Sequence, residues 1–313
     1  MIIVFGSLNM DLVMTVASLP RPGETVLCPD YALKPGGKGA NQAVAARRAG
    51  AEVVMAGCLG PDGFGQALRE NLTREGVDAG CVATVDRPTG CATICVDAKG
   101  ENAIVVASGA NLSAGADQVP ESRLGSGTTV LMQMEVPAAE NWALVARARA
   151  RGARTVLNLA PAAPVPPDTL RDLDVLVVNE LEILALARQF GLAGPAAGDG
   201  DVAGLARAVA GRFGPSVIVT LGGAGAVAAL GDGTLMRVGA LPIEPVDTTG
   251  AGDAFCGVLT AALDRGAGFA DALHRAAVGA GLACLGLGAQ ESLPRAGAVD
   301  ARLRDLPAPG VLT

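Results

Sequence analysis

The strongest constraint on the fold of this 313-residue chain is the alternation of short apolar runs with longer alanine-rich segments. Several runs are apolar throughout, which is typical of strands in a parallel sheet covered by helices on both faces. The expected strands are Ile2–Phe5, Val53–Met55, Thr128–Met132, Thr155–Leu157, Val175–Val178 and Val217–Leu221. The expected helices are Ala40–Ala49, Gln66–Glu75, Ala138–Arg151, Glu180–Phe190, Val202–Phe213 and Ala251–Arg265. The sequence therefore predicts a doubly wound α/β fold with a mostly parallel sheet.

Two segments interrupt this alternation. Residues 12–34 contain strand-like pieces separated by prolines, and residues 90–108 contain two short strand patterns joined by a turn. We expect both segments to form a small antiparallel sheet that projects from the main body. The α/β core is then made of residues 1–11, 35–89 and 109–313.

The composition excludes several classes of protein. The net charge is −7 and charged residues make up only 18% of the chain, so a basic surface for nucleic acid or for a membrane is not expected. The uncharged stretch 213–231 is broken by glycines and a proline, and we expect buried strands there rather than a membrane span. Because the N-terminus resembles no export signal, the cytoplasm is the expected location.

Cysteine and histidine usage narrows the possible chemistry. The seven cysteines are scattered without a C-x-x-C pair, which indicates free thiols in a reducing compartment rather than a disulfide or zinc framework. His274 is the single histidine of the chain. Sites that need several histidines are thereby excluded.

The strongest motif for chemistry is the run DTTGAGD from Asp247 to Asp253, which leads directly into a helical segment. Its glycines let the backbone approach a ligand closely, and the first amides of the helix would form an anion site. A carboxylate there, Asp253, would repel a phosphate unless it has a task. The task that fits is to accept the proton of a hydroxyl that attacks the phosphate. The alternative is an ordinary helix start without a ligand.

A second glycine-rich cluster, GGKGAN at residues 36–41, also runs into a helix. Gly39 stands where a Walker loop requires Ser or Thr, so the cluster is not a P-loop. One lysine, Lys38, and one amide, Asn41, among small residues suit a ligand with many hydroxyl groups. A flexible turn with a solvated lysine is the alternative.

Further polar residues follow the expected strands. Asn9 and Asp11 would project from one face if extended, where they could grip neighbouring hydroxyls or simply be solvated. Asn179 and Glu182 lie three residues apart at a helix start, which suits Mg²⁺ but also an N-cap with a nearby glutamate. Glu135, just past another strand, is equally ambiguous.

The residues Gly223, Gly225 and Ala228 fit the dinucleotide-binding pattern G-x-G-x-x-(G/A) after a strand. That motif requires a helix directly after it, whereas residues 227–230 and 234–238 are expected to form a hairpin. We therefore disfavour dinucleotide binding. A glycine turn between two strands can lie along a nucleotide instead.

Taken together, these segments resemble the ribokinase branch of the phosphofructokinase-B carbohydrate kinase family over essentially the whole chain. The cluster at residues 36–41, continued through Gly50 and Gly60, matches the family's first signature, and residues 247–253 match its second. The resemblance implies transfer of phosphate from ATP to a sugar's primary hydroxyl, here O5 of D-ribose. It also implies Mg²⁺ with ATP, a monovalent cation, usually K⁺, as activator, and a small β-sheet lid through which two copies form a homodimer.

The resemblance also implies roles for individual residues. Asp253 would be the general base, and the amides of Gly250, Ala251 and Gly252 would form the anion hole. The sugar-contacting positions are Asn9, Asp11, Gly37, Lys38, Asn41, Glu135 and Asp253. The ATP positions are Asn179, Thr220, Gly222, Gly223, Gly225 and Gly252, and Glu182 with Asn179 is tied to Mg²⁺. The monovalent-cation positions are Asp247, Thr249, Ala283, Gly286, Gly288 and Ser292.

This sequence departs from the family at the expected adenine contact. Relatives often place His or Asn there, whereas this chain has Ala276, with His274 two residues earlier. Several functions stay open: a kinase for ribose, for deoxyribose, for another small sugar or for a nucleoside, a non-catalytic sugar-binding protein, and a dehydrogenase. The polar set without an aromatic stacking platform favours a small polyol, and an intact Asp253 favours an enzyme over a binder.

Overall fold

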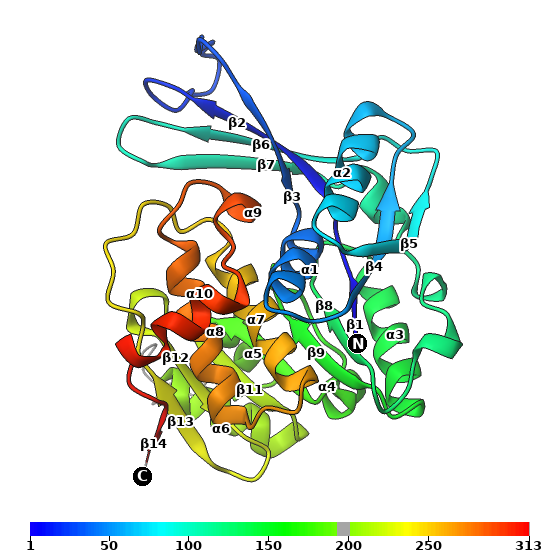
Figure 1. Cartoon of the computed structure of the whole chain (residues 1–313), viewed down its shortest axis with the longest axis vertical. Helices are drawn as coiled ribbons and strands as arrows, with labels where there is room; N and C mark the ends of the chain where they lie inside the picture. Colours follow the sequence, from blue (N-terminus) through cyan, green and yellow to red (C-terminus); the bar gives the residue numbers. More distant parts are fainter. Residues whose placement is uncertain (193–200, 313) are drawn as a thin grey trace.

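The computed structural model describes residues 1–192 and 201–312, which build a large sheet and a smaller one (Figure 1). The large sheet has the spatial order β14 (Gly310–Leu312), β13 (Leu235–Val238), β12 (Ala226–Ala229), β11 (Ser216–Thr220), β10 (Val175–Asn179), β9 (Arg154–Asn158), β8 (Thr129–Met132), β1 (Ile2–Phe5), β4 (Val53–Leu59) and β5 (Asp78–Thr84). The strands from β11 to β5 are parallel, and β12 to β14 are antiparallel. The uncharged stretch 213–231 includes β11 and β12, as expected.

Helices cover both faces of this sheet. One face packs against α1 (Lys38–Arg48), α2 (Gly63–Arg74), α7 (Ala251–Asp264) and α8 (Phe269–Ala283). The other packs against α3 (Ala138–Ala150), α4 (Pro167–Asp172), α5 (Glu180–Gln189) and α6 (Val202–Phe213). Short helices complete the chain: α9 (Ala289–Ser292), α10 (Ala296–Arg302), η1 (Gly109–Ser113), η2 (Ala116–Gln118), η3 (Glu121–Arg123), η4 (Gly222–Ala224) and η5 (Leu303–Asp305). Alternate residues of β1 enter the two cores, so the predicted doubly wound α/β fold is confirmed.

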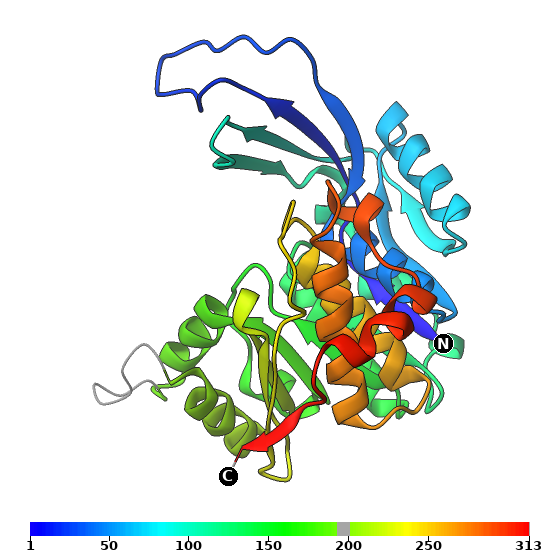
Figure 2. The same cartoon turned by 60° about the vertical axis from the view of Figure 1, so that its left-hand side comes forward.

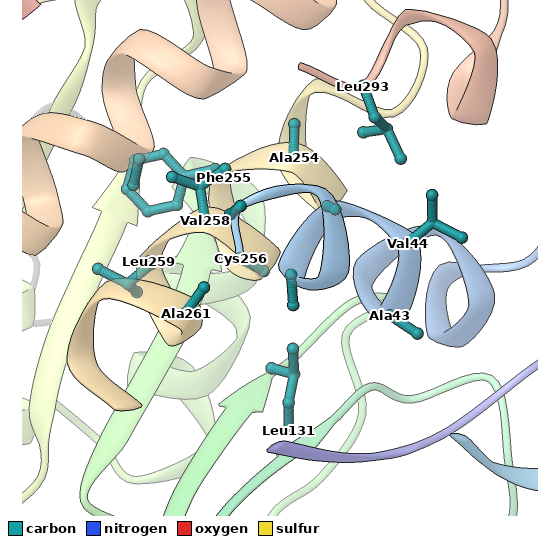
Figure 3. Close-up of a cluster of buried hydrophobic side chains, with 14 of the residues drawn as sticks. Ala43, Val44, Leu131, Ala254, Phe255, Cys256, Val258, Leu259, Ala261 and Leu293 are labelled. Atoms are coloured by element: carbon teal, nitrogen blue, oxygen red, sulfur yellow. The ribbon is translucent and has the colours of Figure 1, made fainter. Parts of the chain in front are cut away.

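Helices α1 and α7 pack unusually closely, because small residues fill their contact. A Cβ atom on Gly257 would lie 2.5 Å from the Cβ of Ala45 and 2.8 Å from the carbonyl oxygen of Gln42, so only glycine permits this approach. Ala43 of α1 and Cys256 of α7 belong to the same buried cluster (Figure 3). This contact brings the first turns of the two helices together.

The topology of the sheet determines where a site can form. Strand β1 lies between β4, which follows it on one side, and β8, which lies on the other. The strand order therefore reverses at β1, and ligands of such sheets bind beyond the carboxyl ends of the strands at that point. The segments that follow β1, β8, β9, β10 and β11 all leave the sheet at this edge.

The small sheet projects from one end of the main body (Figures 1 and 2). Its order is β3 (Ala32–Gly36), β2 (Asn9–Thr15), β6 (Gly90–Val96) and β7 (Asn102–Ala107). The expectation of a wholly antiparallel sheet is wrong for its centre, because β2 and β6 pair in parallel. Both strands begin at the main body, where Asn9 pairs with Gly90, and run outward together. The strands β2 and β3 also extend beyond the expected range 12–34.

Two sequence-based expectations about the chain as a whole can be compared with the structure. All seven cysteines are free, as expected. Within residues 1–192 and 201–312, no helix has the length and apolar character needed to cross a membrane.

Candidate active site

The motif at residues 247–253 begins helix α7, as predicted. Gly250 precedes the helix with φ 77°, and a Cβ atom there would lie 3.0 Å from the Cα of Ala289, so glycine is required. Asp253 lies in the first turn of α7 and is buried, with only 7% of its surface exposed. The structure therefore places a carboxylate beside the free amides of a helix start.

Both oxygens of the Asp253 carboxylate accept hydrogen bonds from side-chain amides of α1. Asn41 Nδ2 donates to Oδ2 and Gln42 Nε2 donates to Oδ1, each at 2.9 Å. Gln42 Nε2 also donates to Asn158 Oδ1 at 3.0 Å, and Gln42 Oε1 accepts from Gln133 Nε2 at 2.7 Å. The carboxylate is thus held from two sides in a fixed orientation.

Polar and charged side chains form a cluster next to Asp253, where the small sheet meets the main body. Glu135 Oε2 accepts a hydrogen bond from the Ser7 hydroxyl at 2.6 Å and from the Lys38 backbone amide at 3.1 Å. Gly37 has φ 87°, and a Cβ atom on it would lie 2.7 Å from the backbone nitrogen of Asn9. The loop before α1 therefore lies directly against the start of β2, which brings the predicted sugar-contacting residues together.

The charges in this polar cluster influence one another strongly. Burial, and then the negative charges of Glu135, Asp253 and Glu291, raise the pKa of Asp11 to about 7. The carboxylate of Asp253, followed by Glu135, raises the pKa of Lys38. A cluster of several carboxylates and one lysine suits a ligand that carries many hydroxyl groups and no charge.

Asn9 is held in place by a residue that the sequence did not single out. Asn111 Nδ2 donates to Asn9 Oδ1 at 2.7 Å, and Asn111 Oδ1 accepts from the Leu8 backbone amide at 2.9 Å. Both asparagines are buried. Asn111 thus fixes the orientation of the Asn9 side chain at the start of β2.

A cavity of about 540 Å³ lies on the other side of the α7 N-terminus. The predicted nucleotide residues that line it are Thr220, Gly222, Gly223, Gly225 and Gly252, together with Ala251 of the expected anion hole. The rest of its lining is mostly apolar and was not predicted: Ala240, Leu241, Pro242, Ile243, Pro245, Thr248, Phe255, Ala277, Ala280, Gly281 and Cys284. A mostly apolar cavity beside a helix N-terminus suits a base followed by phosphates.

The expected hairpin after residue 222 is confirmed. Residues Gly222–Ala224 form the short helix η4, and β12 and β13 pair in antiparallel fashion behind it. A Cβ atom on Gly225, which has φ 89°, would lie 2.1 Å from the carbonyl oxygen of Val238. No helix follows the glycines, so this segment is not a dinucleotide-binding turn.

The adenine position inferred from the resemblance does not line the cavity. Ala276 is buried in the core, and His274 Nε2 lies 2.8 Å from the carbonyl oxygen of Leu306. The face of α8 that lines the cavity instead carries Ala277, Ala280 and Gly281. Ala277 follows Ala276 directly, and successive side chains of a helix point about 100° apart, so only Ala277 of the two faces the cavity.

Asn179 and Glu182 form a reciprocal cap at the start of α5. Asn179 Oδ1 accepts from the Glu182 amide at 2.8 Å, and Glu182 Oε2 accepts from the Asn179 amide at 2.7 Å. Burial raises the pKa of Glu182. The N-cap interpretation therefore describes these contacts, and Asn179 is not among the residues that line the cavity.

The predicted monovalent-cation residues lie together in space. Asp247 Oδ1 accepts from the backbone and hydroxyl of Thr249 at 2.9 and 2.6 Å, and Asp247 Oδ2 accepts from the Gly288 amide at 2.8 Å. The Ser292 hydroxyl donates to the Gly288 carbonyl at 2.6 Å, and a Cβ atom on Gly286 would lie 3.1 Å from the Cβ of Ser292. Ala283 is buried at the end of α8.

Comparison with known proteins agrees with this geometry. The profile of the pfkB family carbohydrate kinases matches residues 1–296. The chain is 35% identical to the ribokinase of Haemophilus influenzae over 296 residues, which cover 93% of this chain and 94% of that protein.

Solved structures give the same result. The ribokinase of Thermotoga maritima aligns with a TM-score of 0.88 at 30% identity, covering 97% of this chain and 99% of that one. The ribokinase of Arabidopsis thaliana complexed with ribose and ATP aligns with a TM-score of 0.85 at 28% identity, covering 97% and 98%. A nucleoside kinase of Methanocaldococcus jannaschii shares the fold at 18% identity with a TM-score of 0.81, covering 97% of both chains. The chain therefore belongs to the pfkB family of carbohydrate kinases and is an ATP-dependent phosphotransferase.

Proposed function

We propose that this kinase is a ribokinase, which transfers the γ-phosphoryl group of ATP to O5 of D-ribose and releases ADP and D-ribose 5-phosphate. The observation that carries the proposal is the position of Asp253. Its buried carboxylate belongs to the same helix turn as Ala251 and Gly252, which line the apolar cavity, and its charge acts on Asp11 and Lys38 of the polar cluster. A carboxylate between the cavity and the polar cluster is placed to act between ATP and a sugar.

Asp253 would act as the general base. It would take the proton from the sugar hydroxyl as that oxygen bonds to the γ-phosphorus, while the bridging oxygen leaves with ADP. The amides of Gly250, Ala251 and Gly252 would stabilise the negative charge on the transferring group. Lys38, whose raised pKa keeps it protonated, would offset part of the negative charge near Asp253.

Ribose is the favoured sugar because of the residues in the polar cluster. Asn9, Asp11, Lys38 and Glu135 offer donors and acceptors at short range, and none of them gives a base a stacking surface. The similarity to ribokinases over nearly the full chain supports the same choice. A nucleoside is the second candidate, because nucleoside kinases share this fold.

Magnesium would enter with ATP. Among the described residues, no group of three or more His, Cys, Asp or Glu side chains could hold a metal ion. The donors present, one Glu182 carboxylate and the Asn179 carboxamide, fit an ion bound mainly by phosphate oxygens and water. When bound, Mg²⁺ neutralises charge that develops on the phosphates.

A monovalent cation, K⁺ by the family resemblance, would bind near Asp247. The groups gathered there are the Asp247 carboxylate, the Thr249 and Ser292 hydroxyls and the Gly288 carbonyl. An all-oxygen set fits an alkali cation. Its binding would hold the 247–249 turn against the segment that follows α8.

The small sheet would act as a lid and as the contact of a homodimer. Three neighbouring residues of its edge strand β7 are exposed although apolar: Ile104 at 53%, Val105 at 71% and Val106 at 46%. Such a patch on an edge strand favours pairing with another copy. Light scattering should then give twice the chain mass, and Val105→Lys should shift the protein toward the monomer.

The proposed function is tested by measuring ADP release from ATP with ribose, deoxyribose, other pentoses, hexoses and nucleosides, each with and without K⁺. We expect ribose to give the highest kcat/KM, with a phosphomonoester at C5 in the ³¹P and ¹³C spectra of the product. A nucleoside that exceeds ribose in kcat/KM would refute the assignment of the sugar. Sugar binding without any ADP release would refute the catalytic role.

A further inference from the structure

The carboxylate of Asp253 is the end of a chain of side-chain amides that crosses the molecule to helix α2. Asn41 Nδ2 donates to Asp253 Oδ2 at 2.9 Å, and Gln290 Nε2 donates to Asn41 Oδ1 at 3.0 Å. Asn71 Nδ2 donates to Gln290 Oε1 at 2.7 Å. Arg74 Nη2 donates to Asn71 Oδ1 at 2.5 Å. Four hydrogen bonds thus connect the surface of α2 to the proposed base.

The direction of every bond in this chain is fixed by its two ends. A guanidinium group can only donate hydrogen bonds and an ionised carboxylate can only accept them. The oxygen of the Asn71 amide must therefore face Arg74, so its nitrogen faces Gln290. The same reasoning passes along Gln290 and Asn41, and the nitrogen of Asn41 must face Asp253.

The amides of this chain are protected from water. The exposed fractions are 6% for Asn41, 4% for Gln290 and 6% for Asn71. An amide buried in this way loses its partner at a cost of about 1–3 kcal/mol, since water cannot replace it. The chain therefore transmits orientation: reversing one amide forces its neighbours to reverse or to leave a buried group unpaired.

Gln290, the middle amide of this hydrogen-bond chain, lies in the segment that is proposed to bind the cation. Gln290 belongs to α9, between Gly288 and Ser292, and its backbone carbonyl accepts a bond of 2.6 Å from Arg48 of α1. The side chain of Gln290 is thus the direct link between that segment and Asn41. An arrangement of this kind lets the position of the segment set the orientation of Asn41.

We infer that Gln290, oriented by Asn71, is a positioning residue for the reaction: it holds Asn41 with its nitrogen toward Asp253 and so keeps that carboxylate aimed at the sugar hydroxyl. This inference rests on the proposed role of Asp253. It assigns a task to Gln290 and Asn71 that needs no contact with sugar or ATP.

The test reverses the direction of the hydrogen bonds between Asn71 and Asp253 by changing Asn71, the amide farthest from Asp253. In Asn71→Asp, the new carboxylate accepts from Arg74 and cannot donate to Gln290. Gln290 must then turn its nitrogen toward the new carboxylate and its oxygen toward Asn41. Asn41 in turn must direct its nitrogen at Gln290 and its oxygen at Asp253. An oxygen dipole facing the carboxylate disfavours its ionised form. We expect kcat with ribose to fall by about 10-fold to 100-fold, and the acid limb of the pH–kcat profile to move to higher pH.

The matched control is Gln66→Glu, which makes the same amide-to-acid change on the exposed face of α2, where the Gln66 side chain donates to Glu70. Its kcat and pH profile should equal those of the parent. Gln290→Met, which has a similar shape and no hydrogen-bonding amide, breaks the chain without adding charge and should lower kcat in the same range. If both Asn71→Asp and Gln290→Met fold and match the control in kcat and pH profile, the inference is overturned. If Asp253→Asn retains turnover, the proposed base is at fault instead.

Discussion

The substitution Asp253→Asn tests the centre of the site and has two consequences that can be separated. A carboxamide offers one acceptor where the carboxylate offers two, yet Asn41 and Gln42 both direct N–H groups at it. One buried donor must therefore lose its partner, which costs about 1–3 kcal/mol of stability. Loss of the base should lower kcat by about 10²–10⁴-fold, equivalent to about 3–5 kcal/mol of transition-state stabilisation.

The two effects are measured on the same preparation. Urea unfolding gives the loss of stability, ADP release at saturating ribose and ATP gives kcat, and calorimetric titration gives ribose affinity, which should survive. Asp271→Asn, which removes the same charge from an exposed pair with Arg275 on α8, serves as the control and should change each quantity little. Turnover within a few-fold of the parent in correctly folded Asp253→Asn would show that this carboxylate is not the base.

Three further predictions follow from the same geometry. Gly37→Ala places a Cβ atom 2.7 Å from the Asn9 backbone nitrogen at a residue with φ 87°. We expect the free energy of unfolding in urea to fall by about 1–3 kcal/mol and the KM for the sugar to rise. An unchanged KM would contradict the described contact. Because the pKa of Asp11 is raised to about 7 from 3.8, the folded state binds the extra proton, and stability should fall as pH rises from 4 to 7, by up to about 4 kcal/mol. Asp11→Asn should flatten that dependence, and an equal slope in both proteins would refute the assignment. Gly257→Ala, whose Cβ atom would lie 2.5 Å from that of Ala45, should cost about 1–3 kcal/mol and lower kcat more than it raises KM, because it separates α1 from α7.

Much of the architecture could be predicted because it follows from local patterns. The apolar runs predicted the parallel strands of the main sheet except β5, and the DTTGAGD motif predicted the glycine turn and the helix that carries Asp253. The hairpin after Gly225 was likewise predicted, since two short strands and a glycine turn are properties of adjacent residues. The parallel pairing of β2 with β6 was missed, because it joins strands about eighty residues apart in sequence and no turn sets its direction.

The charged residues, the turns that need glycine and the start of α7 follow from local sequence, because each depends on a few neighbouring residues. Which amides hold Asp253 depends on the tertiary packing. Gln290 comes from a helix of four residues whose pattern indicates no role, and it reaches Asn41 only because α9 lies against α1. The packing of α8 likewise decided that Ala277 lines the cavity and that Ala276, the position expected from the resemblance, is buried in the core. Partners far apart in the chain are chosen by the packing of whole elements, and one sequence carries no direct record of that choice.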